Sequence, residues 1–254
     1  PAQVSALAAK GYLTLEERET LRNPYADLAR ERDRREIHLS RAQMRAFETL
    51  AELQDTGEAK AALLHGVTGS GKTQIMLKLI DRTLAAGRTA IVMVPEIALT
   101  PQTVRIFCAR YGERVAVIHS SLSAGERFDA WRRIRRGEVD LVIGTRSAVF
   151  APLKNIGLIV VDEEHEHTYK SEQDPKYRTH RVCAYRAGVH HALVVLASAT
   201  PSFESYYAAT HGRYTLVPLT ERFGGAKLPE AEIVDMRQEL RAGNVSPLSH
   251  TLYD

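Results

Sequence analysis

Eight consecutive residues have the types and spacing of a phosphate-binding loop: Gly66, Val67, Thr68, Gly69, Ser70, Gly71, Lys72 and Thr73. They fit the pattern G-x-x-x-x-G-K-[ST]. Glycines let backbone N–H groups turn toward an anion, and the N-terminus of a following helix adds a favourable field. We expect Lys72 to reach the β- and γ-phosphates of ATP and the Thr73 hydroxyl to bind Mg²⁺. The alternative is a glycine-rich turn that holds no ligand.

Two carboxylates stand directly after an apolar run later in the chain. Residues 158–161 are Leu, Ile, Val and Val, and Asp162 and Glu163 follow them. At the carboxyl end of a buried strand, Asp162 can hold the Mg²⁺ shell, and Glu163 can orient and deprotonate the attacking water. Consecutive acids alone are a weak signal, so the prediction of a catalytic set of Lys72, Asp162 and Glu163 depends on the phosphate loop.

The segments around these motifs alternate short apolar runs with stretches of helical length. We expect strands at residues 61–64, 89–94, 115–119, 141–144, 158–161 and 193–197. We expect helices at residues 72–86, 101–111, 124–136, 180–189 and 202–210. The apolar runs lack alternation, which is typical of strands buried on both faces of a parallel sheet. Repeated strand–helix–strand order predicts a doubly wound α/β domain.

Composition and charge exclude several classes of protein. The chain has 254 residues, of which 44% are hydrophobic, and it has two cysteines. Cys108 and Cys183 are far apart, which argues against a disulfide framework or a zinc site in this stretch and fits a reducing cytoplasm. No apolar run approaches the roughly 18 residues of a membrane span, and no signal peptide is visible. A net charge of +3 permits a nucleic-acid partner without requiring one.

Several motifs resemble those of a known enzyme family. Residues 162–165 read Asp-Glu-Glu-His, similar to the DEAH/DExH box of superfamily 2 helicases, and residues 198–200 resemble the Ser-Ala-Thr motif that links hydrolysis to nucleic-acid binding. Three further segments narrow the resemblance to the bacterial primosomal helicases of replication restart: residues 94–102, 144–150 and 196–202. The similar region spans about residues 39–219. It implies a RecA-like P-loop NTPase lobe, with a mostly parallel sheet flanked by helices on both faces, in an ATP-dependent 3′-to-5′ DNA helicase.

The resemblance also implies functions for residues near the two motifs. Gln43 corresponds to a glutamine that reads adenine, although a glutamine just after the N-cap residue Ser40 can also be an ordinary residue on a helix surface. His165 is expected to act with the catalytic residues. Its hydrogen bonds would couple the ATP site to Ser198 and Thr200.

Loops that follow alternate strands are expected to face DNA. Their hydroxyl, amide and guanidinium groups suit contacts with phosphates, and they come from Thr100, Gln102, Thr145, Arg146 and Ser147. In this interpretation the same surface includes His119, Ser120 and Ser121. The arginines of residues 131–136 are better explained as a solvated helix face than as DNA contacts.

Residues 169–178 resemble an aromatic-rich loop that senses single-stranded DNA. Bases would stack on Tyr169 or Tyr177, while Lys170 and Arg178 would bind phosphates. The chain departs from the family pattern near Asp174, where an aromatic residue is usual, and at His180 and Arg181, where an Arg-Asp pair is usual. These departures weaken the prediction for DNA sensing more than the prediction for hydrolysis.

We expect three regions along the chain. Residues 1–36 would be the tail of an N-terminal, winged-helix DNA-binding region and a linker, with a helix end and short strand at residues 6–13. The mixed charges of residues 30–36 favour a linker over a binding patch. Residues 37–220 would form the ATP-binding lobe. Residues 221–254 would lead into a second lobe, with a strand at 232–236 and a helix start at 246–248.

The family supplies further expectations about cofactors and partners. Zinc is expected only in a later part of a longer protein, together with arginine fingers on a second lobe. Partners would be single-stranded and forked DNA, replication-restart and primosome proteins and single-stranded DNA-binding protein, in the bacterial cytoplasm near the nucleoid and without a membrane. One alternative is a nucleotide-binding, DNA-docking module without motor activity. A small-molecule kinase would leave the Asp-Glu-Glu-His and Ser-Ala-Thr motifs unexplained.

Overall fold

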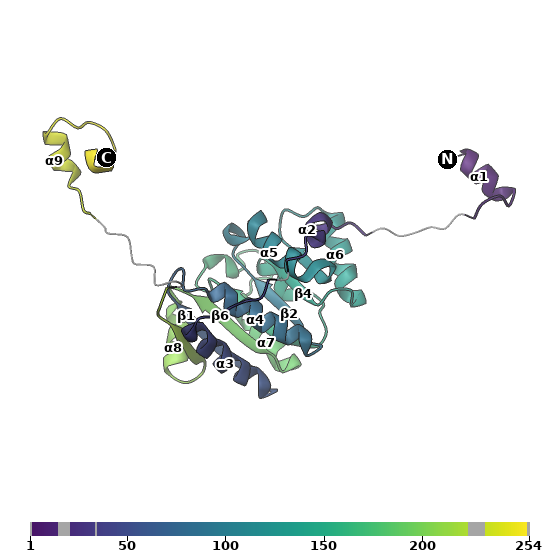
Figure 1. Ribbon diagram of the computed structural model, residues 1–254, viewed down its shortest axis with the longest axis horizontal. Coiled ribbons are helices and arrows are strands. Elements are labelled where there is room, and N and C mark those ends of the chain that lie inside the picture. The colour runs from purple at the N-terminus through teal and green to yellow at the C-terminus, as the bar shows by residue number, and fades with distance from the viewer. Residues whose placement is uncertain (1, 15–20, 34, 223–231, 253–254) are drawn as a thin grey trace. The chain divides into compact units, whose positions relative to one another are not determined.

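A computed structural model describes residues 2–14, 21–33, 35–222 and 232–252 of the chain (Figure 1). The chain divides into two compact units, Pro1–Phe223 and Gly224–Asp254. Nearly all elements that bear on function belong to the first unit, which holds every strand that the structure describes. Within the described ranges, no helix has the length and apolar character needed to span a membrane.

A parallel sheet of seven strands forms the centre of the first unit. The strands are β1 (Lys60–Gly66), β2 (Thr89–Met93), β3 (Val115–Ile118), β4 (Leu141–Gly144), β5 (Ile156–Asp162), β6 (Leu193–Ser198) and β7 (Thr215–Leu219). Their order is β3-β4-β2-β5-β6-β1-β7, and all neighbours pair in parallel. All six predicted strands are present. β7 was not predicted, because its Pro218 interrupts the apolar run and is compatible with a strand only at a sheet edge.

Helices cover both faces of this sheet, as predicted. The helices are α3 (Arg41–Asp55), α4 (Lys72–Ala85), α5 (Pro101–Tyr111), α6 (Ala124–Arg136), α7 (Thr179–His190) and α8 (Phe203–Thr210). Successive strand residues point to opposite faces. Val92 of β2 therefore lies in the core with α3, α4 and α5, whereas Ile91 lies in the core with α6, α7 and α8.

Short sequence signals set where these helices begin and end. Ser40 and Gln43 form a capping box at the start of α3, and Ser123 and Glu126 form one at the start of α6. Thr100 caps α5 immediately before a proline. Short 3₁₀ turns follow three strands, at Glu96–Ala98, Arg146–Phe150 and His167–Tyr169, and a further one, Gly112–Arg114, joins α5 to β3.

The N-terminal segment forms two short helices before the sheet begins. Helix α1 (Ala2–Ala9) ends near Gly11, whose φ of +76° is the left-handed conformation expected of a helix-ending glycine. The strand expected after it at residues 12–13 is absent, because no strand in the described part of the chain pairs with this segment. Helix α2 (Ala26–Arg30) packs on α5, and the Asp33 N–H donates to the Ala109 carbonyl at 2.9 Å.

The second unit holds one short helix, α9 (Met236–Arg241), and a 3₁₀ turn at His250–Leu252 within its described residues. The strand predicted at residues 232–236 is wrong. Asp235 there accepts a hydrogen bond from the Arg237 N–H and caps α9. The helix start predicted at 246–248 is also wrong, because those residues form bends before the 3₁₀ turn. The sequence also predicts a loop at residues 222–229, of which residues 223–229 lie outside the described residues.

Candidate functional site

The phosphate-binding loop joins β1 to α4 at the carboxyl edge of the sheet. Gly69 and Gly71 have φ of +77° and +81°, values that other residues rarely adopt. A side chain at Gly71 would also collide with Gln43. Lys72, the first residue of α4, is buried, and its Nζ donates to the Gly66 carbonyl at 2.8 Å. The loop is therefore folded around its lysine.

Gln43, in the first turn of α3, is hydrogen-bonded to this loop. The side chain is 1% exposed, so the alternative of an ordinary surface glutamine is wrong. Its Nε2 donates to the Ser70 carbonyl at 2.9 Å, and its Oε1 accepts from the Ser40 N–H at 2.8 Å. Both ends of the amide are thus engaged within the protein, and the adenine contact stays a prediction.

The two predicted carboxylates face the phosphate loop across a hollow of about 400 Å³. The hollow is lined by Thr68, Gly69, Gly71, Lys72, Thr73, Gln74, Asp162 and Glu163. Burial and the neighbouring charge of Glu163 raise the pKa of Asp162 to about 6, although Lys72 opposes the shift. Glu163 itself has a φ of +43°, a strained conformation for a residue with a side chain.

The residues of this hollow fit a nucleotide with Mg²⁺. Ser70 Oγ is buried and has no hydrogen-bond partner among the described residues, as expected of a group placed for an anion. Burial and the charge of Glu163 raise the pKa of Asp162, and a cation beside the carboxylate would favour its charged form. A hydroxyl and a carboxylate are ligands that Mg²⁺ prefers. Thr73 and Asp162 supply these two groups, and both line the hollow.

Hydrogen bonds connect the acidic box to the end of β6. His165 Nδ1 lies 2.8 Å from Ser198 Oγ and 3.6 Å from Glu163 Oε2. Ser198 Oγ in turn accepts from the backbone N–H of Thr200 at 3.0 Å. His165 and Ser198 are in direct contact, and Thr200 joins them through its backbone. The coupling that this contact would provide stays a prediction.

A groove of about 680 Å³ gathers most of the residues predicted to bind DNA. Its lining includes Thr145, Arg146, Ser147, Lys170 and Tyr177, together with His119 and Ser120. Arg146 Nη1 donates to the Lys170 carbonyl at 2.7 Å, and its guanidinium carbon lies 5.9 Å from the centre of the Tyr177 ring. Tyr177 also meets Phe150 edge to face. Residues after three different strands therefore converge on one surface.

Tyr169 does not belong to this surface. Its side chain is 2% exposed, and its hydroxyl donates to the Asp162 carbonyl at 2.7 Å. The prediction that bases stack on Tyr169 is wrong for this conformation, because the ring ties the aromatic-rich loop to the end of β5. Its burial depends on packing against α7, which no local pattern reveals.

Ser121, which was expected on the same surface, is exposed outside the groove lining, and three predicted DNA contacts also lie outside it. Thr100 Oγ1 accepts from the Thr103 N–H as a helix cap, and Gln102 is exposed on the first turn of α5. Arg178 Nη1 lies 3.9 Å from Glu204 Oε1. DNA contact by these three stays a prediction. The groove also contains Glu96 and Arg127, which sequence reasoning missed. Glu96 lies within the motif of residues 94–102 but was not singled out there, and Arg127 stands in no motif.

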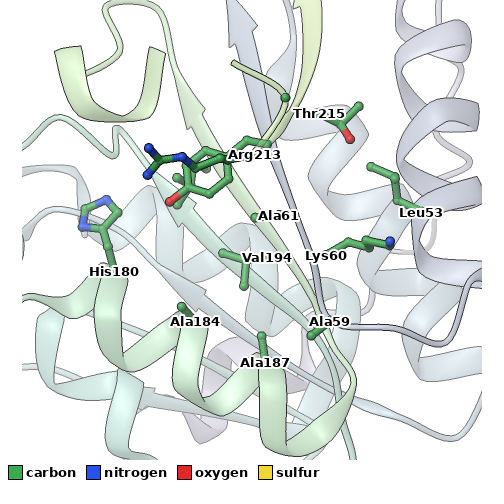
Figure 2. Close-up of a pocket in the computed structure, with 13 residues that line it drawn as sticks. Leu53, Ala59, Lys60, Ala61, His180, Ala184, Ala187, Val194, Arg213 and Thr215 are labelled. Carbon is green, nitrogen blue, oxygen red and sulfur yellow. The ribbon is translucent and has the colours of Figure 1, made fainter. Parts of the chain in front are cut away.

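A separate hollow of about 490 Å³ lies on the face of the sheet covered by α7 and α8 (Figure 2). Ala61 and Val194 form part of its apolar floor, and Ala184 and Ala187 reach it from α7. None of the residues predicted to bind nucleotide or DNA lines it, so it is a different feature from the two sites above.

Comparison with protein families agrees with this geometry. The model of the DEAD/DEAH box helicase family matches residues 40–208, which include the phosphate loop, the acidic box and the groove residues. The chain belongs to the DEAD/DEAH box helicase family. Membership in this helicase family implies the use of nucleotide and Mg²⁺.

Curated relatives in the helicase family share much of the sequence. The chain is 49% identical over 253 residues to replication restart protein PriA of Bacillus subtilis (strain 168), a match that covers 100% of the chain and 31% of that protein. It is 42% identical to PriA of Synechocystis sp., over 98% of the chain and 30% of that protein. The resemblance to primosomal helicases is confirmed, and the chain spans about a third of the length of these relatives.

Solved helicase structures share the fold. RecG bound to a three-way DNA junction superposes with a TM-score of 0.57 at 25% identity, covering 76% of this chain and 25% of that one. The Hef helicase domain of Pyrococcus furiosus gives a TM-score of 0.51 at 19% identity, over 71% of this chain and 38% of that one. The predicted RecA-like fold, with a parallel sheet between two layers of helices, is confirmed.

Proposed function

We propose that this chain is the ATP-binding lobe of a 3′-to-5′ DNA helicase of replication restart. The observation that carries the proposal is the convergence of Lys72, Thr73, Asp162 and Glu163 on one hollow, in a chain 49% identical along its length to a replication restart protein. The groove that contains Arg146 and Lys170 supports DNA as the polymer along which the helicase moves.

The residues of the hollow have separate roles in this proposal. Lys72 would bind the β- and γ-phosphates, and Thr73 and Asp162 would hold Mg²⁺. When bound, Mg²⁺ would neutralise charge that develops on the phosphate oxygens. Glu163 would orient and deprotonate the attacking water. Its strained backbone supports this role, because strain of this kind is concentrated at functional sites.

The DNA-binding residues would hold one strand by its backbone. Arg146 already uses one guanidinium nitrogen to fix the Lys170 carbonyl, so its planar group is held at the groove wall. Lys170 is exposed and can meet a phosphate, while Tyr177 is packed against Phe150 and offers only part of its ring. We therefore propose a groove in which charge contributes more to binding than base stacking does.

The longer protein would supply the rest of the motor. Residues 1–36 would be the tail of an N-terminal, winged-helix DNA-binding region and a linker, and residues 221–254 would lead to a second RecA-like lobe with arginine fingers. Zinc would belong to a later insertion. Forked DNA, primosome proteins and single-stranded DNA-binding protein would be the partners, in the bacterial cytoplasm where the chromosome lies. This chain alone would hydrolyse ATP weakly, because an arginine finger contributes a factor of about 10³–10⁵ in related NTPases.

An unwinding experiment tests the proposal. Partial duplexes with a 3′ or a 5′ single-stranded tail on the loading strand would be given to a version of the chain extended through a second lobe. We expect ATP-dependent unwinding of the 3′-tailed duplex and none with Glu163→Gln, the matched control. Unwinding of the 5′-tailed duplex alone would refute the polarity. DNA binding without unwinding of either duplex would favour the docking module.

A further inference from the structure

Glu164, the third residue of the acidic box, is a buried charge that the proposed chemistry does not use. Its side chain is 2% exposed, and no other Asp or Glu among the described residues is buried to this degree. Taking a carboxylate out of water is costly unless hydrogen bonds and charges compensate. Its surroundings therefore need to be explained.

The carboxylate holds the loop that follows β6. Oε1 accepts from the Ser202 N–H at 2.6 Å, and Oε2 accepts from the hydroxyls of Ser202 and Ser205 at 3.1 Å and 2.8 Å. Ser202 is the N-cap of α8, so the negative charge sits at the favourable end of that helix. The Glu164 N–H also donates to the Ala197 carbonyl at 3.1 Å. The residue thus fixes the box against the segment that contains Ser198 and Thr200.

His180 approaches the same carboxylate from α7. Its Nε2 lies 3.3 Å from Glu164 Oε2, yet this buried nitrogen has no aligned hydrogen bond. Burial alone raises the pKa of Glu164, but the contacts from His180, Ser202 and Ser205 outweigh it and hold that pKa below its usual value. Glu164 is therefore charged at neutral pH, and its carboxylate faces the His180 ring.

Helix α7 connects this pair to the DNA groove. Residues 170–178, which supply Lys170 and Tyr177 to the groove, end where α7 begins. An isolated antiparallel β-bridge between the backbones of Lys170 and Arg178 closes the loop, and the Ser171 N–H donates to the Tyr177 carbonyl at 2.8 Å. Thr179 Oγ1 donates to the Tyr169 carbonyl at 2.7 Å. A shift of this loop would therefore move the first turn of α7 and His180 with it.

We propose that Glu164 is a positioning residue which, through His180, couples residues 170–178 to the catalytic base Glu163. Glu163 is the preceding residue in the chain, and its strained φ of +43° makes its geometry sensitive to the anchoring of Glu164. The proposal rests on the proposed ATP-driven function. It assigns to Glu164, the third residue of the Asp-Glu-Glu-His box, a role distinct from that of His165, which contacts Ser198.

The test uses a version of the chain extended through a second lobe, with kcat and KM for ATP measured with and without single-stranded oligo-dT. We expect His180→Ala to leave unstimulated kcat and KM within about twofold and to lower DNA-stimulated kcat by about fivefold or more, the range of typical coupling energies. His180→Gln, which keeps an N–H donor near the position of Nε2, should restore most of the stimulation. His190→Ala, at the other end of α7, is the matched control.

Glu164→Gln tests the proposed coupling between Glu164 and His180 independently. It keeps an acceptor for the Ser202 N–H and removes the charge that faces His180. We expect it to lower DNA-stimulated kcat as His180→Ala does, and we expect the double variant to lose no more than the larger single loss. Glu166→Gln, in the same turn, controls for charge removal.

The outcomes separate this proposal from the proposed function. Equal DNA stimulation in the wild-type protein and His180→Ala would overturn the link between His180 and Glu163. A parallel fall of stimulated and unstimulated rates in His180→Ala, with no rescue by His180→Gln, would show a merely structural contact and would also overturn it. Absence of DNA stimulation in the wild-type protein would instead refute the proposed function on which it rests.

Discussion

In the absence of Mg²⁺, the ionised carboxyl of Asp162 should lower the stability of the folded protein. Asp162→Asn, which removes the charge, should therefore raise the free energy of unfolding. The pKa of this half-buried carboxyl is raised from 3.8 to about 6. The shift is about two units, and at 1.36 kcal/mol per unit it costs about 3 kcal/mol once the group is ionised. Asparagine keeps the acceptor for the Glu163 N–H, which donates to Asp162 Oδ1 at 3.0 Å, and removes the charge.

The pH dependence has a definite sign. The folded state binds the proton of Asp162 more tightly than the unfolded chain does, so this residue's contribution to stability falls as pH rises from about 4 to about 6 and then stays low. The advantage of Asp162→Asn should be about 2–3 kcal/mol at pH 8 and should vanish near pH 4. Urea denaturation followed by circular dichroism, without Mg²⁺ or nucleotide, measures this difference.

Two controls make the measurement decisive. Glu172→Gln removes an exposed acid and should change stability by less than about 0.5 kcal/mol at either pH. Mg²⁺ with a non-hydrolysable ATP analogue should stabilise the wild-type protein and not Asp162→Asn, because binding to the folded state alone raises its stability. If Asp162→Asn were less stable than the wild-type protein at pH 8, the raised pKa and its physical cause would be wrong.

Other substitutions separate the two sites. Lys72→Ala should abolish binding of a fluorescent ATP analogue, because the positive charge that binds the phosphates is lost. Glu163→Gln should keep that binding and lower DNA-stimulated kcat by about 10²–10⁴ in the extended version. Normal turnover by Glu163→Gln would show that Glu163 is not the catalytic base. Arg146→Ala should weaken the binding of single-stranded oligo-dT, measured by fluorescence anisotropy, and should leave nucleotide binding unchanged. The slope of log K against the logarithm of the salt concentration should fall by about the amount expected for one lost ionic contact. An unchanged salt dependence would show that Arg146 only holds the loop of residues 170–178 in place and does not contact DNA phosphates.

The sequence predicted the phosphate loop, the acidic box and six strands because those signals are local. Residues 66–73 carry their chemistry in consecutive positions, and the strands are continuous apolar runs. The missed features depend on contacts between distant segments. Gln43 lies against a loop 27 residues away, and Tyr169 is buried only because α7 packs beside it. The segments predicted as short strands at residues 12–13 and 232–236 formed none, since a strand needs a partner.

The groove was predicted in part for the same reason. Arg146 and Lys170 follow different strands, and the rule that parallel strands end at one edge placed them together. The direction of each side chain was not predictable, because it depends on the folding of short loops. Glu164 illustrates the limit: in sequence it is one of three consecutive carboxylates with Asp162 and Glu163, yet in the structure it faces the interior.

The central claim is that ATP hydrolysis in this chain serves movement on DNA. The most direct measurement is the steady-state rate of ATP hydrolysis, with and without single-stranded DNA, by this chain and by a version extended through a second lobe. We predict slow hydrolysis by the chain alone and strong stimulation by DNA only in the extended version. Strong DNA-stimulated turnover by the 254-residue chain alone, or no stimulation in either version, would contradict the account.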